Sequence, residues 1–165
     1  MNKIVAIIVA LSFIQAVSAQ DNKNDFEPKT KTEHILFAIA AIEHDSDLVS
    51  ALAYINEAML KDSNNSFCYA VRGHIYLLQK NYKLALADFY QVTLFDPADF
   101  SGFLGQAKCR YFLKDYDNAL KDLNRAIILE PFGGDVYLWR SKVKKALGDV
   151  VGAETDLKIY QKMNE

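Results

Sequence analysis

The sequence repeats its own pattern every 34 residues, most clearly around residues 66–99. One column of this register holds an alanine in every copy, namely Ala51, Ala85, Ala119 and Ala153. A second column holds a large apolar residue, namely Ile55, Phe89, Leu123 and Leu157. Self-similarity at such a period is typical of repeat proteins, in which each unit is stable only when it packs against its neighbours. The sequence therefore predicts an array built from one recurring structural unit.

Each copy contains two amphipathic segments separated by a turn. In the clearest copy, apolar or small residues stand at positions 69, 73 and 76 and again at 85, 89 and 92. Spacings of three and four residues place each set on one face of an α-helix. Pro97 and Pro131 follow second segments and stop the helices before them. We therefore expect an all-α fold of helix–turn–helix units.

An acidic or amide side chain precedes the second segment of every copy. These residues are Asp47, Asn81, Asp115 and Asp149. An oxygen in this position can accept hydrogen bonds from the backbone N–H groups of the first helical turn, which otherwise have no partner. We expect each of the four to cap its helix.

Six residues of the clearest copy stand at the spacings of a known 34-residue pattern: Tyr69, Gly73, Tyr76, Ala85, Phe89 and Pro97. With these residues the sequence resembles the tetratricopeptide repeat. The resemblance implies a tetratricopeptide-like helical solenoid over residues 32–165, with repeats at about 32–65, 66–99, 100–133 and 134–165. The copies also depart from the pattern, because Arg110 and Lys144 replace Tyr76 and Ile39 replaces Gly73. We expect these changes to alter local packing and to leave the architecture intact.

The first 19 residues have the pattern of a secretory signal peptide. Lys3 supplies a positive start, residues 4–14 are apolar, and Val17, Ser18 and Ala19 form a cleavage site of small residues. A membrane anchor is the alternative, although a span needs about 20 apolar residues. We expect export to the periplasm or the outside of the cell, with residues 20–31 as a flexible polar arm.

Charge and composition exclude several classes of function. The chain has 19 basic and 21 acidic side chains, so it has no general affinity for nucleic acid. His34, His44 and His74 lack the spacing of a metal site, and no motif of a catalytic nucleophile or a phosphate-binding loop occurs. We expect no enzymatic activity, no metal and no cofactor.

The two cysteines are compatible with buried thiols. Export permits a disulfide between Cys68 and Cys109, and this bridge remains an alternative. However, Cys109 lies seven residues deeper in its repeat than Cys68 does, which is about 10 Å of helical rise. A disulfide needs Cα atoms within about 7 Å. We therefore expect two buried thiols.

The resemblance also implies where a partner binds, because the first helices of successive tetratricopeptide repeats line a concave groove. The residues expected on this face are Phe67, His74, Leu77, Leu104, Lys108, Tyr111, Leu138, Lys142 and Lys145. The basic end of the stripe favours a protein or peptide segment with acidic and apolar residues. The alternative is that the leucines pack against their neighbours and the lysines form a solvated surface.

A non-catalytic protein-binding module is therefore the expected function. The alternative hypothesis is a structural or assembly subunit of a cell-envelope complex that uses its convex face or its termini. In the last repeat, Glu154, Gln161 and Lys162 replace residues that are apolar in most earlier copies. A polar outer face suits a terminal repeat, so we expect the array to end there and the isolated protein to be monomeric.

The signal peptide gives the first testable prediction. Cleavage after Ala19 should leave a mature chain that begins at Gln20. Intact-mass measurement of protein recovered from outside the cytoplasm checks this. Recovery of a chain that retains residues 1–19, in the membrane fraction, would instead support an anchor.

Overall fold

The computed structural model describes residues 30–43 and 47–165 of the chain. These residues form helices and no strands. The helices are α2 (Lys31–Glu43), α3 (Leu48–Lys61), α4 (Ser66–Leu78), α5 (Tyr82–Phe95), α6 (Phe100–Phe112), α7 (Tyr116–Leu129), α8 (Gly134–Ala146) and α9 (Val150–Met163). The chain divides into two compact units between Ser63 and Asn64. The first unit contains α2 and α3, and the second contains α4 to α9.

In the first unit, α2 and α3 pack against each other through small and branched apolar residues. Ala38 and Ile55 are fully buried. Lys31 at the start of α2 pairs with Asp62 after the end of α3, with 2.6 Å between Nζ and the carboxylate oxygen. This unit is one pair of packed helices, as the repeat pattern predicts.

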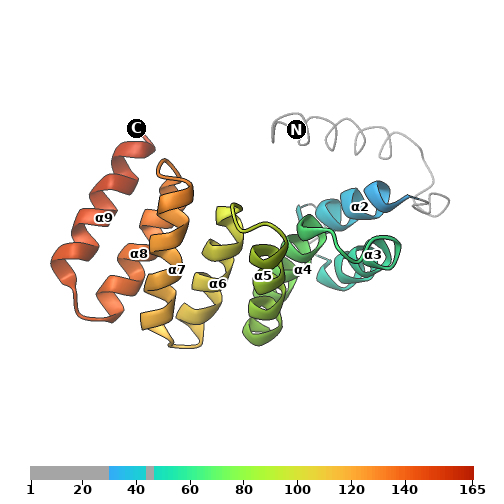
Figure 1. The fold of residues 1–165 in the computed structure, drawn as a ribbon, viewed down its shortest axis with the longest axis horizontal. Coiled ribbons are helices and arrows are strands. Elements are labelled where there is room, and N and C mark those ends of the chain that lie inside the picture. The colour runs from blue at the N-terminus through green and yellow to red at the C-terminus, as the bar shows by residue number, and fades with distance from the viewer. Residues whose placement is uncertain (1–29, 44–46) are drawn as a thin grey trace. The chain divides into compact units, whose positions relative to one another are not determined.

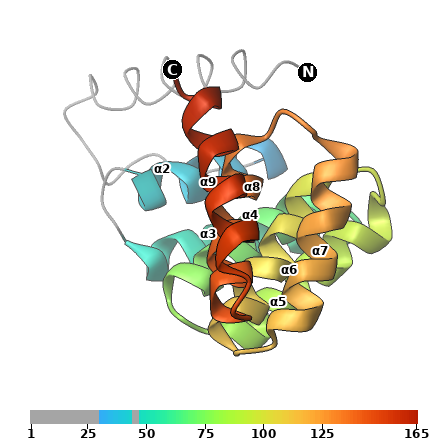
Figure 2. The same cartoon turned by 90° about the vertical axis from the view of Figure 1, so that its left-hand side faces the viewer.

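In the second unit, three helix pairs follow one another in chain order (Figure 1). Figure 2 looks from the C-terminal side, with α9 in front. The first helices of the three pairs begin at Ser66, Phe100 and Gly134, which are the first residues of the expected repeats. Each helix contacts its partner within the pair, and α5 and α7 also contact the first helix of the next pair. The expected all-α helical-repeat architecture is confirmed.

The ring of Phe89 holds neighbouring pairs together. Phe89 on α5 is buried, and it lies between Gly73 on α4 and Gly105 on α6. A Cβ atom on Gly105 would lie 2.3 Å from the ring, and one on Gly73 would lie 3.2 Å from it. Glycine at both places lets the helix backbones approach the ring. Phe89 is thus wedged between its own repeat and the next, which agrees with its place in the column of large apolar residues.

The helix caps agree with the sequence expectation at two of the four sites. Asp47 accepts from the backbone N–H groups of Val49 and Ser50, and Asp149 accepts from that of Gly152. The expectation is wrong at the other two sites. Asn81 makes no side-chain cap bond, and Asp115 accepts instead from the side-chain amide of Asn118. The asparagine side chain in the first turn competes there with the backbone for the carboxylate.

A column of aspartates pairs with cations on the first helices. Asp88, Asp122 and Asp156 recur at the 34-residue interval and are all buried. Arg72 binds Asp88 through two hydrogen bonds of 2.8 Å, and Arg140 binds Asp156 through bonds of 2.8 and 2.7 Å. These pairs join the two helices of each repeat. They satisfy carboxylates that would be costly to bury alone.

The same column explains two departures from the tetratricopeptide pattern. In the third copy, Gln106 stands where Arg72 would return, and Arg110 supplies the cation for Asp122 from one turn further along α6. In the fourth copy, Lys144 adds a second cation to Asp156 at 2.9 Å. Arg110 and Lys144 therefore replace the pattern's tyrosine in the two copies where that position pairs with the aspartate.

The cysteines are buried and are not joined to each other. Cys68 and Cys109 both have no exposed surface. Burial raises the pKa of the Cys109 thiol to about 12. The expectation of two buried thiols is confirmed, and the alternative of a bridge between them is wrong.

The two ends of the chain differ in what the structure describes. The expected signal peptide at 1–19, and residues 20–29 of the expected polar arm, lie outside the described residues. Within the described ranges, no helix is long and apolar enough to cross a membrane. In the last repeat, Glu154, Gln161 and Lys162 are exposed on α9, as expected of its outer face.

Replacement of Phe89 by alanine tests the packing between repeats. The change should lower the free energy of unfolding by about 3–5 kcal/mol, because it leaves a cavity between three helices. The matched control is Tyr90→Ala at the next position, where the side chain is 56% exposed. That change should stay within about 0.5 kcal/mol of the parent. Chemical denaturation measures both, and equal effects would contradict the packing.

The aspartate column predicts a specific dependence of stability on acid. Burial of Asp156 alone would raise its pKa, but hydrogen bonds from Arg140 and Lys144 outweigh burial and lower it. The ionised carboxylate therefore stabilises the fold above its unfolded pKa of about 3.9, and this contribution disappears as the pH falls through the lower folded value. Asp156→Asn should flatten the loss of stability below about pH 4.

Asp122 is the control, because its pKa is shifted in the opposite direction to that of Asp156. Burial raises its pKa more than the bond from Arg110 lowers it. Its contribution to stability is therefore complete below the unfolded pKa and is lost as the pH rises through the folded value. Asp122→Asn should make the acid loss steeper. Denaturation curves at several pH values measure how the free energy of unfolding of each variant changes with pH. If this change in acid is the same for Asp156→Asn as for the parent, the expected role of Asp156 is wrong.

Candidate partner-binding face

Four of the residues expected in the groove come together on the first helices of the second unit. His74 lies on α4, Lys108 and Tyr111 lie on α6, and Lys142 lies on α8. The first helices α4, α6 and α8 contact one another in sequence, so residues on them form one continuous face. The charge of Lys108 acts on His74, and the charge of Lys142 acts on Lys108.

Trp139 on α8 lies at the centre of this group. The ammonium nitrogen of Lys142 is 4.3 Å from the centroid of the indole ring, and that of Lys108 is 5.5 Å from it. A cation over the face of a tryptophan is attracted by the ring's negative π-surface. The two lysines are thereby held beside an aromatic surface, a pairing of charge and apolar area that suits recognition of a mixed peptide segment.

Further aromatic rings extend from Trp139. Tyr111 and Phe112 at the end of α6 meet the indole edge-on, with centroids 5.7 and 6.0 Å away. Phe112 also stacks on Tyr82 of α5, with centroids 4.6 Å apart and ring planes 9° from parallel. Phe112 is 44% exposed. We call His74, Lys108, Tyr111, Phe112, Trp139 and Lys142 together the Trp139 site.

The electrostatics of the Trp139 site favour a negative partner. Burial is the main cause that lowers the pKa of Lys108; Asp135 opposes this shift and Lys142 adds to it. The pKa of His74 is lowered first by burial and then by the charge of Lys108. The charge of Lys142 thus makes protonation of Lys108 less favourable, and the charge of Lys108 does the same for His74. An anion bound between them would relieve that repulsion.

The structure does not bring all nine expected residues to this site. Leu104 is buried in the core between α6, α7 and α8, so it offers no binding surface. Leu77 is partly buried and packs against the core around Phe89. Phe67, which is 53% exposed, and Lys145 lie on the same helices but are not among the side chains around Trp139. Leu138, which directly precedes Trp139 in the sequence, is half-buried.

Sequence reasoning missed Trp139 and Tyr82. The 34-residue register places Trp139 in the column of Val71 and Gly105, which are buried. A column of core residues gives no reason to expect a binding residue. The available signal was that Trp139 is the single tryptophan of the chain and stands three residues before Lys142 on one helix face.

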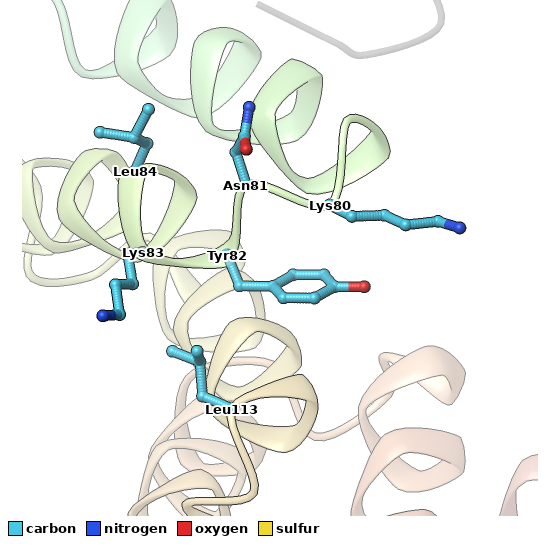
Figure 3. Close-up of a pocket in the computed structure, with 6 residues that line it drawn as sticks. All are labelled: Lys80, Asn81, Tyr82, Lys83, Leu84 and Leu113. Atoms are coloured by element: carbon cyan, nitrogen blue, oxygen red, sulfur yellow. The ribbon is translucent and has the colours of Figure 1, made fainter.

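A shallow hollow lies beside the Tyr82–Phe112 stack, at the turn between α4 and α5. It has a volume of about 260 Å³. Its lining consists of Lys80, Asn81, Tyr82, Lys83, Leu84 and Leu113 (Figure 3). Tyr82 and Leu113 come from neighbouring helix pairs, so the hollow lies between two successive turns.

Within residues 30–43 and 47–165, no cluster of histidine, cysteine, aspartate or glutamate is arranged to hold a metal ion. The three pairs of arginine and aspartate are used within the fold. The chemistry that the Trp139 site offers is therefore binding by aromatic surface and positive charge.

Comparison with known proteins supports the repeat assignment. Residues 68–99 match the family model of the tetratricopeptide repeat. This stretch contains α5 and nearly all of α4. No curated protein sequence matches the chain.

Solved structures are similar in fold. A thermophilic TPR protein of Thermus thermophilus superposes with a TM-score of 0.75 at 16% identity, over 81% of this chain and 74% of that one. MamA from Desulfovibrio magneticus RS-1 gives 0.73 at 16% identity, over 81% and 75%. The TPR domain of Arabidopsis OM64 gives 0.68 at 21% identity, over 70% and 95%.

The TM-scores show a shared fold, and at 16–21% identity these similarities show nothing about partners or sites. The chain is an all-α protein with the helical-repeat fold of tetratricopeptide proteins. This fold is typical of protein–protein interaction modules, which are generally non-catalytic.

Proposed function

We propose that this protein is a non-catalytic module that binds a segment of another protein on the face formed by α4, α6 and α8. The observation that carries the proposal is Trp139 with Lys108 and Lys142 over its ring. A partner segment with apolar and acidic side chains complements both parts of this arrangement. Its apolar side chains would pack on the aromatic rings, and its carboxylates would pair with the lysines.

The two kinds of contact have different roles. Aromatic residues at the centre of an interface supply most of the affinity, because they bury large rigid surfaces at little entropic cost. Charges at the rim act mainly on the rate of association and on orientation. Tyr111 and Phe112 enlarge the apolar part of the site, and Lys142, which is exposed, represents the charged part.

A second candidate function rests on the outer face of α5. Tyr90 and Leu94 are 56% and 60% exposed there. The position on α7 that corresponds to Tyr90 is polar, namely Asn124. Exposed apolar side chains on one outer helix favour a role as an assembly subunit that docks through its convex side.

The place of action is also a proposal. The pattern of residues 1–19 supports export, so the partner would be a periplasmic or extracellular protein. The isolated chain would be a monomer, because the exposed polar residues of α9 do not favour stacking of a further copy on that helix.

Charge reversal at Lys142 tests the proposal. The probe is a library of synthetic peptides that combine acidic and apolar residues, and intrinsic fluorescence of Trp139 reports binding because it is the only tryptophan. Lys142→Glu should raise the Kd of the best peptide about tenfold, about 1.4 kcal/mol, and reduce the salt dependence of association. Tyr111→Ala should mainly speed dissociation.

Lys158→Glu is the matched control, since Lys158 is an exposed lysine on α9 with no part in the Trp139 site. It makes the same change in net charge and should leave the Kd unchanged. The proposal fails if no peptide alters the fluorescence of Trp139, or if both reversals weaken binding equally.

A further inference from the structure

The hollow at the α4–α5 turn differs in chemistry from its counterpart in the next repeat. Its lining shifted by 34 residues gives Lys114, Asp115, Tyr116, Asp117, Asn118 and Leu147. Lysine, tyrosine and leucine therefore persist at three positions. Lys83 becomes Asp117 and Leu84 becomes Asn118. Repeat architecture alone would give both turns the same character, so the basic and apolar lining is particular to the first of them.

The lining of the hollow is positive and partly apolar. Lys80 and Lys83 contribute cations, and no acidic side chain is among the residues that line it. In the described part of the chain, neither lysine has an ion-pair partner. Leu84 and Leu113 are 52% and 38% exposed. A carboxylate next to an apolar side chain complements this lining in charge and in surface.

A chain of contacting aromatic rings links the hollow to the Trp139 site. Tyr82 lines the hollow and stacks on Phe112, and Phe112 contacts Trp139. Leu113 of the hollow follows Phe112 directly in the chain. An aromatic ridge thus connects two basic regions, one with Lys108 and Lys142 and the other with Lys80 and Lys83.

The backbone of Lys80 is in a conformation that favours glycine. Its φ is 62°, and the same turn position has φ of 63° at Lys114 and 87° at Gly148. A side chain in the left-handed region costs roughly 1–2 kcal/mol. The last repeat uses glycine here, whereas the turn beside the hollow keeps a lysine.

We infer that the hollow is a second subsite for the same partner, and that the bound segment crosses the Tyr82–Phe112 stack to reach it. The inference rests on the proposed function of the Trp139 site. The partner is a peptide segment with acidic residues at both ends of an apolar stretch. One end pairs with Lys108 and Lys142, the apolar stretch covers the ridge, and the other end enters the hollow.

The experiment compares two lysines that differ only in their relation to the hollow. Lys80→Gly and Lys114→Gly both remove a cation and both relieve a positive φ, so their effects on stability should match. Only Lys80 lines the hollow. A third variant, Leu84→Asn, introduces the residue found at the equivalent position of the next turn.

The probes are synthetic peptides with acidic residues at both ends of an apolar stretch, and isomers with all acidic residues at one end. Trp139 fluorescence and calorimetry measure binding. Lys80→Gly and Leu84→Asn should each raise the Kd of the two-ended peptide about three- to tenfold, Lys114→Gly should not, and the one-ended isomer should bind all forms equally.

The possible failures are distinct. If the two-ended peptide changes Trp139 fluorescence but binds Lys80→Gly and Leu84→Asn as tightly as the parent, the second subsite is wrong and the Trp139 site stands. If no peptide changes the fluorescence, the proposed function fails and the second subsite fails with it.

Discussion

The close approach of α5 to its two neighbouring first helices is the contact on which the second unit depends. Phe89 fills the space that side chains at Gly73 and Gly105 would otherwise occupy. Helices of 13 and 14 residues are marginal alone in water, so their stability comes from packing of this kind. Because α4 and α6 both rest on one ring, their exposed faces keep a fixed relation to each other, and so do the side chains of the binding face.

The aspartate column adds a second constraint within each repeat. A buried carboxylate must have a cation nearby, and this requirement decides which residues stand on the facing side of the first helix. It accounts for Arg110 and Lys144 where the tetratricopeptide pattern has a tyrosine. It also removes Arg72 and Arg140 from the binding surface, since both are used inside the fold. On the first helices, Lys108 and Lys142 remain available to a partner.

Much of this could be predicted from the sequence. The 34-residue period predicted the helices, their pairing, the starts of the repeats and the burial of Phe89, because each copy repeats the same packing problem. Features particular to one copy could not be predicted from the period. Leu104 was expected at the surface but lies in the core, and Trp139 was overlooked although it is the centre of the site. The caps at Asn81 and Asp115 were also wrong, and at Asp115 the reason is that the side-chain amide of Asn118 occupies the carboxylate, which the period does not reveal.

The central claim is that the partner contacts the aromatic and basic face of the first helices and not the outer face of α5. Two exposed aromatic residues allow a direct comparison: Phe112 in the Trp139 site and Tyr90 on the outer face. A photo-crosslinking aromatic amino acid at each position, activated in the native cells and followed by mass spectrometry, identifies what each face touches. The account predicts one recurring protein segment, rich in acidic and apolar residues, crosslinked from position 112 and absent from position 90. Recovery of a recurring partner from position 90 alone would contradict it.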